Sequence, residues 1–345
     1  MKGIVLTGIR KIEIRELPDP EIKNENDVLV RMTKVGVCGS DVHYYSTGQI
    51  GDQIVEYPFT VGHEGAGIVE RVGDKVTQVK PGDRIAVEPA MPCWKCDQCK
   101  AGRPHTCREL KFLGCPQQAE GCLSEFIVVP EECCLKIPDS MSFEEAAISE
   151  PLAIGLYALK QSGDVKEKRI GILGSGPIGL SVLMPALSLG AEKAYMTDKI
   201  DDRLKIATAA GAAWTGNPSK EDIVSKIEKE EPGLLDIVFE CCGEQDAVDQ
   251  AIKILKPGGT LMIVGIPPVL DEWSIPAHAI RLKEITIKNV RRQNHCVEQA
   301  LDMITNKNFD VNIMVTHRFD LAETISAFKM VENYEDGVLK AMISL

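Results

Sequence analysis

The segment from Ile170 to Ala191 constrains the fold most strongly, because it joins a long apolar run to a defined glycine spacing. It has no charged residue, yet its five glycines and two prolines argue against a membrane-spanning helix. Gly174, Gly176 and Gly179 form the pattern G-x-G-x-x-G between an apolar stretch and an expected helix. The segment therefore predicts the first strand, turn and helix of a dinucleotide-binding fold.

Each residue type in this pattern has a physical role in holding a dinucleotide. The glycines permit a tight turn, a close approach to the pyrophosphate and close helix–strand packing, while Pro177 and Ile178 open a helix whose free N–H groups face phosphates. Asp198, nineteen residues after Gly179, follows the second expected strand and would accept hydrogen bonds from the adenosine ribose. Asp198 favours NAD over NADP, and Arg203 is a further predicted cofactor contact; the alternative is a nucleotide-free turn with a solvated aspartate.

The rhythm of the sequence predicts an α/β protein with a β-rich domain and a doubly wound parallel domain. Short strands rich in Val and Ile fill the first ~140 residues, and strands alternate with helices after Lys168. Ser142 and Glu145 form a capping box at an expected helix start, and a second helix is expected to end at Gly258–Gly259. We expect a catalytic domain of residues 1–150 and 284–345 around a dinucleotide domain of residues 151–283.

Charge and cysteine usage exclude several functions. A net charge of −12 over 345 residues argues against nucleic acid as a partner. The N-terminal stretch lacks the apolar core of a signal peptide, and the cysteines are spaced unlike a disulfide framework. We therefore expect a cytoplasmic protein with no membrane partner.

Four of the twelve cysteines form a cluster with the spacing C-x2-C-x2-C-x7-C. These are Cys93, Cys96, Cys99 and Cys107. Four thiolates so close in sequence can close a tetrahedral shell around zinc, which leaves no open position for water. The pattern predicts a structural zinc site; the alternative is four unrelated free thiols.

A second metal site can be assembled from Cys38, His63, Glu64 and Glu150, in the stretches VGVCGSD, TVGHEGAG and ISEPLAIG. Cysteine, histidine and carboxylate with one open position are the ligands of a catalytic zinc. Each residue alone has an ordinary structural explanation. The sequence leaves open whether Glu64 or Glu150 binds the metal directly.

The stretches CGSDVH, VGHEGAG, GSGPIG and SEPLAIG, together with the cysteine cluster, resemble the zinc-dependent medium-chain alcohol dehydrogenases. YYSTGQIGD, VRRQN and VTHRF resemble the polyol (sorbitol, xylitol, iditol) dehydrogenase branch. The resemblance implies a GroES-like catalytic domain, an inserted Rossmann domain and a homo-oligomer, either dimer or tetramer. It also implies one catalytic and one structural zinc, the former held by Cys38, His63 and a carboxylate. The glycines of TVGHEGAG would then give Glu64 room beside the metal.

The resemblance further assigns roles to individual side chains. Ser40 and His43 correspond to the proton relay, with an ordinary surface histidine as the alternative. Tyr44, Phe112 and Arg292 correspond to substrate contacts. The implied function is NAD-dependent, zinc-assisted reversible oxidation of a polyol secondary alcohol to a ketose. Alternatives are a dehydrogenase for 2,3-butanediol, threonine or a sugar-alcohol phosphate, or a non-catalytic scaffold that binds NAD and zinc.

Overall fold

The computed structural model describes residues 1–267 and 272–345 and divides into two compact units. The first unit comprises Met1–Glu150 and Val297–Leu345, and the second comprises Pro151–Cys296. The expected boundary after residue 283 lies instead after Cys296. The reason is that β18 (Thr286–Asn289) pairs with β17 (Leu255–Ile263), so it belongs to the sheet of the second unit.

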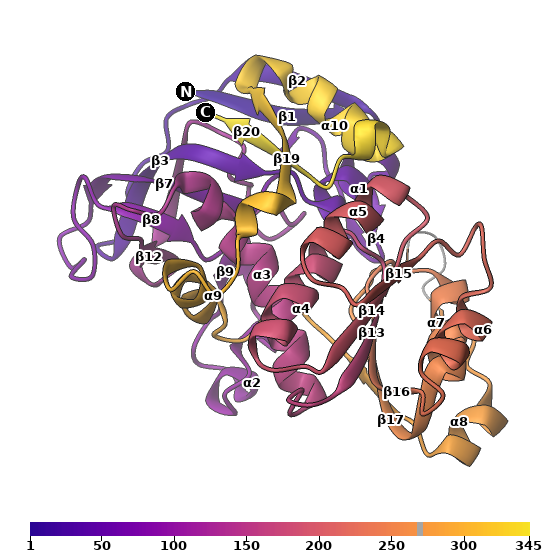
Figure 1. Cartoon of the computed structure of the whole chain (residues 1–345). Coiled ribbons are helices and arrows are strands. Elements are labelled where there is room, and N and C mark those ends of the chain that lie inside the picture. The colour runs from indigo at the N-terminus through magenta and orange to yellow at the C-terminus, as the bar shows by residue number, and fades with distance from the viewer. Residues whose placement is uncertain (268–271) are drawn as a thin grey trace. The chain divides into compact units, whose positions relative to one another are not determined.

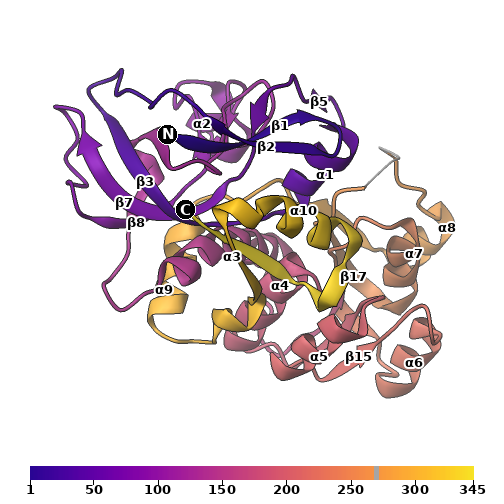
Figure 2. The ribbon, with the colours of Figure 1, turned by 90° about the horizontal axis from the view of Figure 1, so that it is seen from above.

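The first unit is built on a seven-stranded sheet that joins distant parts of the chain. Its order is β12-β8-β7-β3-β20-β19, and β11 also pairs with β3. The central strand β3 (Asp27–Gly36) lies antiparallel to β7 (Glu64–Val72) and to β20 (Lys340–Ser344). Figure 2 shows the C-terminal end of the chain beside β3. Residues near both chain ends therefore meet in one sheet.

The other strands of the first unit are β1 (Lys2–Gly8), β2 (Lys11–Glu16), β4 (Gln49–Ile50), β5 (Gln53–Ile54), β6 (Phe59–Thr60), β8 (Arg84–Val87), β9 (Ala90–Met91), β10 (Lys111–Phe112), β11 (Phe126–Pro130), β12 (Cys134–Lys136) and β19 (Val315–Asp320). Its α-helices are α1 (Gly39–Thr47), α2 (Asp97–Lys100), α9 (Val297–Thr305) and α10 (Thr324–Asn333), and α3 (Phe143–Ser162) begins there. The Val- and Ile-rich strands bury a common core of aliphatic side chains, as their composition predicts.

The second unit is a parallel sheet whose strands are joined along the chain by helices (Figure 1). The strand order is β15-β14-β13-β16-β17-β18, which in chain order reads 3-2-1-4-5-6. The remaining strands are β13 (Arg169–Leu173), β14 (Lys193–Thr197), β15 (Trp214–Gly216) and β16 (Leu235–Glu240). The helices are α4 (Pro177–Ser188), α5 (Asp201–Ala209), α6 (Ile223–Glu230), α7 (Gln245–Ile254) and α8 (Ala277–Lys283). The predicted doubly wound Rossmann fold is confirmed.

The sequence predicted one helix start correctly and one helix end wrongly. The capping box at the start of α3 is confirmed, because Ser142 N donates to Glu145 (2.7 Å) and Glu145 N donates to Ser142 Oγ (3.1 Å). The helix expected to reach Gly258–Gly259 ends at Ile254 instead. Pro257 disfavours helical geometry at the residue before it, and the chain enters β17 at Leu255, which pairs with Leu235 of β16.

The apolar run of residues 170–191 forms most of β13, the glycine turn and α4. Within residues 1–267 and 272–345, no helix combines the length and the apolarity that a membrane crossing requires.

Candidate metal centres and dinucleotide site

Cys38, His63 and Glu64 come together in the first unit as a group of possible metal ligands. Their ligand atoms all lie within 4.8 Å of one another. Cys38 caps the N-terminus of α1, two residues after β3 ends, and Glu64 is the first residue of β7. Because β3 and β7 are paired with Gly36 opposite Glu64, the two strand ends bring the three residues together. Sulfur, imidazole and carboxylate donors suit zinc.

The glycines around His63 and Glu64 have a different purpose from the expected one. Gly62 has a φ of +101°, and a Cβ there would lie 2.9 Å from Leu123 Cγ. A Cβ at Gly65 would lie 2.5 Å from Met32 Cε. The glycine that gives the carboxylate of Glu64 its room is Gly36 on β3, where a Cβ would overlap Glu64 Oε2. Gly62 and Gly65 therefore leave room for Leu123 and Met32 and not for Glu64, which corrects the sequence interpretation.

Asp41 orients two of the possible ligands and was not identified from the sequence. It is fully buried, and its carboxylate accepts N–H groups from Cys38 (3.0 Å) and Gly62 (3.0 Å). Asp41 Oδ1 lies 3.5 Å from His63 Nδ1. Burial lowers the pKa of His63, but the charges of Asp41 and Cys38 raise it well above its usual value. The position therefore favours a cation. The signal in the sequence was the capping-box spacing from Cys38 to Asp41.

Lys340 forms a buried ion pair with Glu64, which the sequence interpretation also missed. Its Nζ lies 2.6 Å from both carboxylate oxygens of Glu64 and donates to the carbonyl of Val37 at 3.2 Å. Both charged side chains are 1% exposed. Burial lowers the pKa of Lys340, and Glu64 and Cys38 more than offset this, so that the pKa is raised. The available signal was a lysine at the start of the apolar strand KAMISL, because a lysine that becomes fully buried there needs a charged partner.

Glu150 lies near the ligand group without belonging to it. It is 5% exposed on α3, and it is not among the three residues whose ligand atoms cluster. Burial, with the charges of Glu64 and Glu88, raises the pKa of Glu150 to about 7, against the lowering effects of His63 and Lys340. These couplings place the carboxyl in the electrostatic field of the same site.

The predicted relay and pocket residues of the first unit differ in their contacts. Phe112 packs against His63, with ring centroids 5.4 Å apart. Tyr44 is buried on α1 and its hydroxyl donates to Gln53 Oε1 at 2.9 Å. Ser40 and His43 are half-buried on the same helix, and burial lowers the pKa of His43. Arg292 belongs to the second unit, so its role as a substrate contact stays a prediction.

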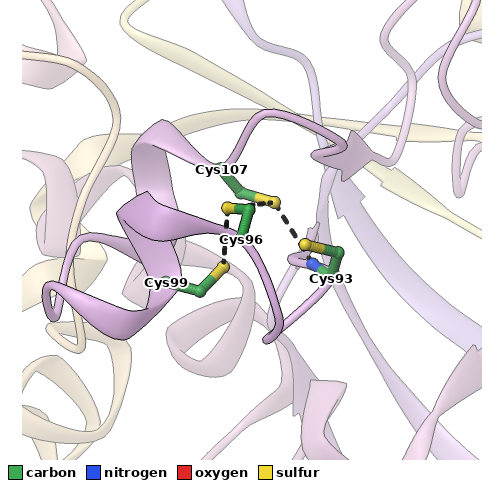
Figure 3. A group of neighbouring side chains, drawn as sticks. All are labelled: Cys93, Cys96, Cys99 and Cys107. Atoms are coloured by element: carbon green, nitrogen blue, oxygen red, sulfur yellow. Dashed lines mark hydrogen bonds between the residues drawn. The ribbon is translucent and has the colours of Figure 1, made fainter.

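The four-cysteine cluster forms a compact group in the first unit (Figure 3). Cys96 Sγ lies 3.6 Å from Cys99 Sγ and 3.9 Å from Cys107 Sγ, and Cys93 N donates to Cys107 Sγ at 3.2 Å. Backbone N–H groups of Arg108 and Cys99 lower the pKa of Cys96 to about 6. Four sulfurs close to one another fit a closed zinc shell.

The glycine turn in the second unit has the geometry that a dinucleotide requires. Gly174 has a φ of +107°, and a Cβ at Gly179 would overlap the carbonyl oxygen of Gly174. A Cβ at Gly176 would meet only one heavy atom of the described residues within 4 Å, Arg203 Nη1 at 3.6 Å. The first and third glycines are thus required by the fold, and the second keeps the N-terminus of α4 open to phosphate.

Asp198 follows β14 and is bonded to the same turn. Its Oδ2 accepts the N–H of Ser175 at 2.8 Å, and its Oδ1 accepts the N–H of Ile200 at 2.9 Å. Each carboxylate oxygen keeps a second lone pair for a ligand hydroxyl. Arg203, on α5, is buried beside Gly176. Pro177 and Ile178 form the first turn of α4, as predicted.

Comparison with known proteins identifies the class of these units. Residues 24–139 match the alcohol dehydrogenase GroES-like domain, and residues 177–306 match the zinc-binding dehydrogenase domain. Sorbitol dehydrogenase of Mus musculus is 37% identical over 99% of this chain and 95% of its own length.

Two solved structures are similar over the whole chain, each covering 100% of this chain and 99% of its own. One is 2R,3R-butanediol dehydrogenase from Bacillus subtilis, with 29% identity and a TM-score of 0.90. The other is a zinc-binding dehydrogenase from Sinorhizobium meliloti bound to NADP, with 29% identity and a TM-score of 0.91. The chain therefore belongs to the zinc-binding alcohol dehydrogenase family, a family of oxidoreductases that act on CH–OH groups and typically use zinc and NAD.

Proposed function

We propose that this protein catalyses the NAD-dependent, reversible oxidation of a secondary alcohol of a polyol to a ketose. The supporting observation is the group of Cys38, His63 and Glu64, in which His63 and Glu64 are buried, in a chain that matches sorbitol dehydrogenase over almost its whole length. The reaction converts an alcohol and NAD⁺ into a ketone, NADH and a proton. Bound zinc would lower the pKa of the substrate hydroxyl, and NAD would accept the hydride.

We assign direct metal binding to Glu64 in preference to Glu150. Glu64 contributes a carboxylate oxygen to the ligand group, whereas Glu150 lies outside it. Glu150 would then act on the metal's open position through a water molecule. Metal content measured in Glu64→Gln and Glu150→Gln variants separates the two roles. Loss of the catalytic zinc only in Glu150→Gln would reverse the assignment.

The proton released from the substrate would leave through Ser40 and His43. Both are half-buried on α1, which begins directly after Cys38. Histidine is suited to this role because it exchanges protons near neutral pH. Tyr44 and Phe112 would line the substrate site, since Phe112 packs on the ring of His63, and Arg292 would bind a substrate hydroxyl. A His43→Gln variant should lose activity at low pH and recover it as hydroxide replaces the shuttle.

Asp198 favours the binding of NAD over that of NADP. A carboxylate at the end of β14 repels the 2′-phosphate of NADP and accepts bonds from a free ribose hydroxyl. The solved relative with bound NADP shows that the family also accommodates the other cofactor. The catalytic efficiency with NADP should rise in Asp198→Ser, and an unchanged preference would contradict the assigned role.

The substrate and the catalytic role are tested together by a screen of NAD reduction. Sorbitol, xylitol, ribitol, galactitol, 2,3-butanediol and threonine should be compared at equal concentration. The similarity to butanediol dehydrogenase makes the small diol the second candidate. A scaffold without catalytic activity would reduce NAD with none of them and would be indifferent to Cys38→Ala.

We also propose a cytoplasmic homo-oligomer. None of the twelve cysteines, all of which lie within the described residues, forms a disulfide, as expected in a reducing compartment. β18 is the last strand in the order of its sheet, and Leu282 on the neighbouring α8 is 64% exposed. The last strand of a sheet is suited to pairing with a second copy of the chain. Light scattering of the native protein and of Leu282→Glu would measure the assembly.

A further inference from the structure

Glu240 is a fully buried acid at the carboxyl end of β16, and the proposed mechanism does not use it. Its Oε1 accepts the N–H groups of Cys242 (2.7 Å) and Gly243 (2.6 Å). Its Oε2 has no hydrogen-bond partner among the described residues. A buried carboxyl oxygen without a donor is costly, so this position has a purpose beyond filling space.

Three loops converge on Glu240. The backbone carbonyl of Glu240 accepts the N–H groups of Val264 (2.9 Å) and Gly265 (3.0 Å), which follow β17. A Cβ at Gly265 would lie 2.5 Å from Glu240 Oε2. A Cβ at Gly174, in the dinucleotide turn after β13, would lie 3.1 Å from the Cβ of Cys242. The residues that directly follow β13, β16 and β17 are therefore closely packed against one another.

Glu240 lies at the carboxyl end of β16, the edge of the sheet at which this fold binds dinucleotides. In an open parallel sheet of this order, a dinucleotide lies across the carboxyl ends of the strands, where the strand order reverses between β13 and β16. Asp198 and the glycine turn belong to the half of the sheet formed by β13, β14 and β15, which holds the adenosine half. The residues that follow β16, and residues 264–267 after β17, are left for the nicotinamide half.

We propose that Glu240 is a positioning residue for the nicotinamide half of the cofactor, an inference that rests on the proposed dinucleotide function. By holding two successive N–H groups of the loop after β16, its carboxyl fixes the backbone against the glycine turn and the end of β17. Fixing the loop before binding removes an ordering cost that the cofactor would otherwise bear. Gly243 (φ +77°) and Gly265 permit the close approach that this arrangement needs.

The test compares Glu240→Ala with a matched variant of a buried acid at the opposite end of the same sheet. Glu231 is 6% exposed and accepts bonds from Arg169 (2.7 Å) and Tyr195 (2.9 Å), at the side where β13 begins. Titration calorimetry measures the Kd of each protein for NAD and for AMP, which probes the adenosine half alone. Glu240→Ala should weaken NAD binding at least about tenfold and leave AMP binding unchanged, whereas Glu231→Ala should lower the melting temperature and change neither Kd.

A second variant distinguishes a loss of cofactor affinity from unfolding of the second unit caused by Glu240→Ala. Glu240→Gln keeps one oxygen for the two N–H groups and should retain the NAD affinity of the native protein within about threefold. Equal losses for NAD and AMP in Glu240→Ala, or an unchanged NAD Kd, would overturn the inference. If the native protein bound AMP and NAD with no measurable affinity, the dinucleotide function itself would fail, which is a separate outcome.

Discussion

Replacing Lys340 by methionine measures how much the buried ion pair between Lys340 and Glu64 stabilises the protein. Methionine has a similar length and no charge, so the substitution leaves the carboxylate of Glu64 buried without its ammonium partner. Glu64 is 1% exposed and belongs to the same ligand group as Cys38 and His63. The loss should therefore be much larger than that of a surface ion pair.

The size of the expected loss in unfolding free energy can be estimated from the distance between Lys340 and Glu64. Opposite charges 2.6 Å apart attract by about 6 kcal/mol at an effective dielectric constant of about 20. Much of that attraction offsets the desolvation of the two groups, but removing one partner leaves the other group's desolvation uncompensated. Breaking a buried pair in this way costs about 3–5 kcal/mol. We expect a loss of that size in the free energy of unfolding of the chelated protein.

Zinc should reduce this loss. A cation held by Cys38, His63 and Glu64 supplies the counter-charge that the ammonium no longer provides. Urea unfolding of Lys340→Met and native protein, each with zinc and after chelation, gives the two differences. The difference with zinc should be smaller by at least about 1 kcal/mol, and zinc affinity should rise correspondingly by linkage.

Two control variants separate the effect of burial from that of losing any lysine. Lys75→Met removes an ammonium from a pair with Glu25 in which both side chains are more than 60% exposed, and it should cost at most about 1 kcal/mol in either metal state. Lys340→Met combined with Glu64→Gln should recover part of the stability. A loss under about 1 kcal/mol in Lys340→Met, or one that does not depend on zinc, would refute the argument.

Three further predictions concern the other sites. Cys107→Ser should release the structural zinc and lower the melting temperature while NAD binding in the second unit persists; retained zinc stoichiometry by mass spectrometry would count against the assignment. Gly179→Ala should destabilise the second unit by about 1–3 kcal/mol, because its Cβ overlaps the carbonyl of Gly174, whereas Gly176→Ala should keep the melting temperature and lose NAD affinity. In the chelated protein the pKa of Glu150 is raised from 4.5 to about 7, so the folded state holds a proton that the unfolded chain has released within this window. Stability should then fall as pH rises from about 4.5 to 7, and Glu150→Gln should flatten that slope.

The sequence predicted those parts of the protein whose cause is local. The glycine turn, the capping box of Ser142 and Glu145, and the close spacing of the four cysteines depend on residues within a few positions of one another. Steric limits on the backbone and reach between neighbouring side chains decide such features, and both can be inferred from spacing. The alternation of strands and helices likewise predicted the parallel sheet.

The partners of the metal centre depended on the tertiary structure. Lys340 meets Glu64 only because β20 pairs with β3, and Gly36 gives Glu64 its room only because β3 and β7 share a register. The boundary after Cys296 likewise follows from the pairing of β18 with β17. The sequence by itself determined which chemical groups this protein has and where backbone geometry must be unusual. Strand pairing between residues hundreds of positions apart decided which charges are buried together, since the energy of a charge depends on its surroundings in space and not on its neighbours in the chain.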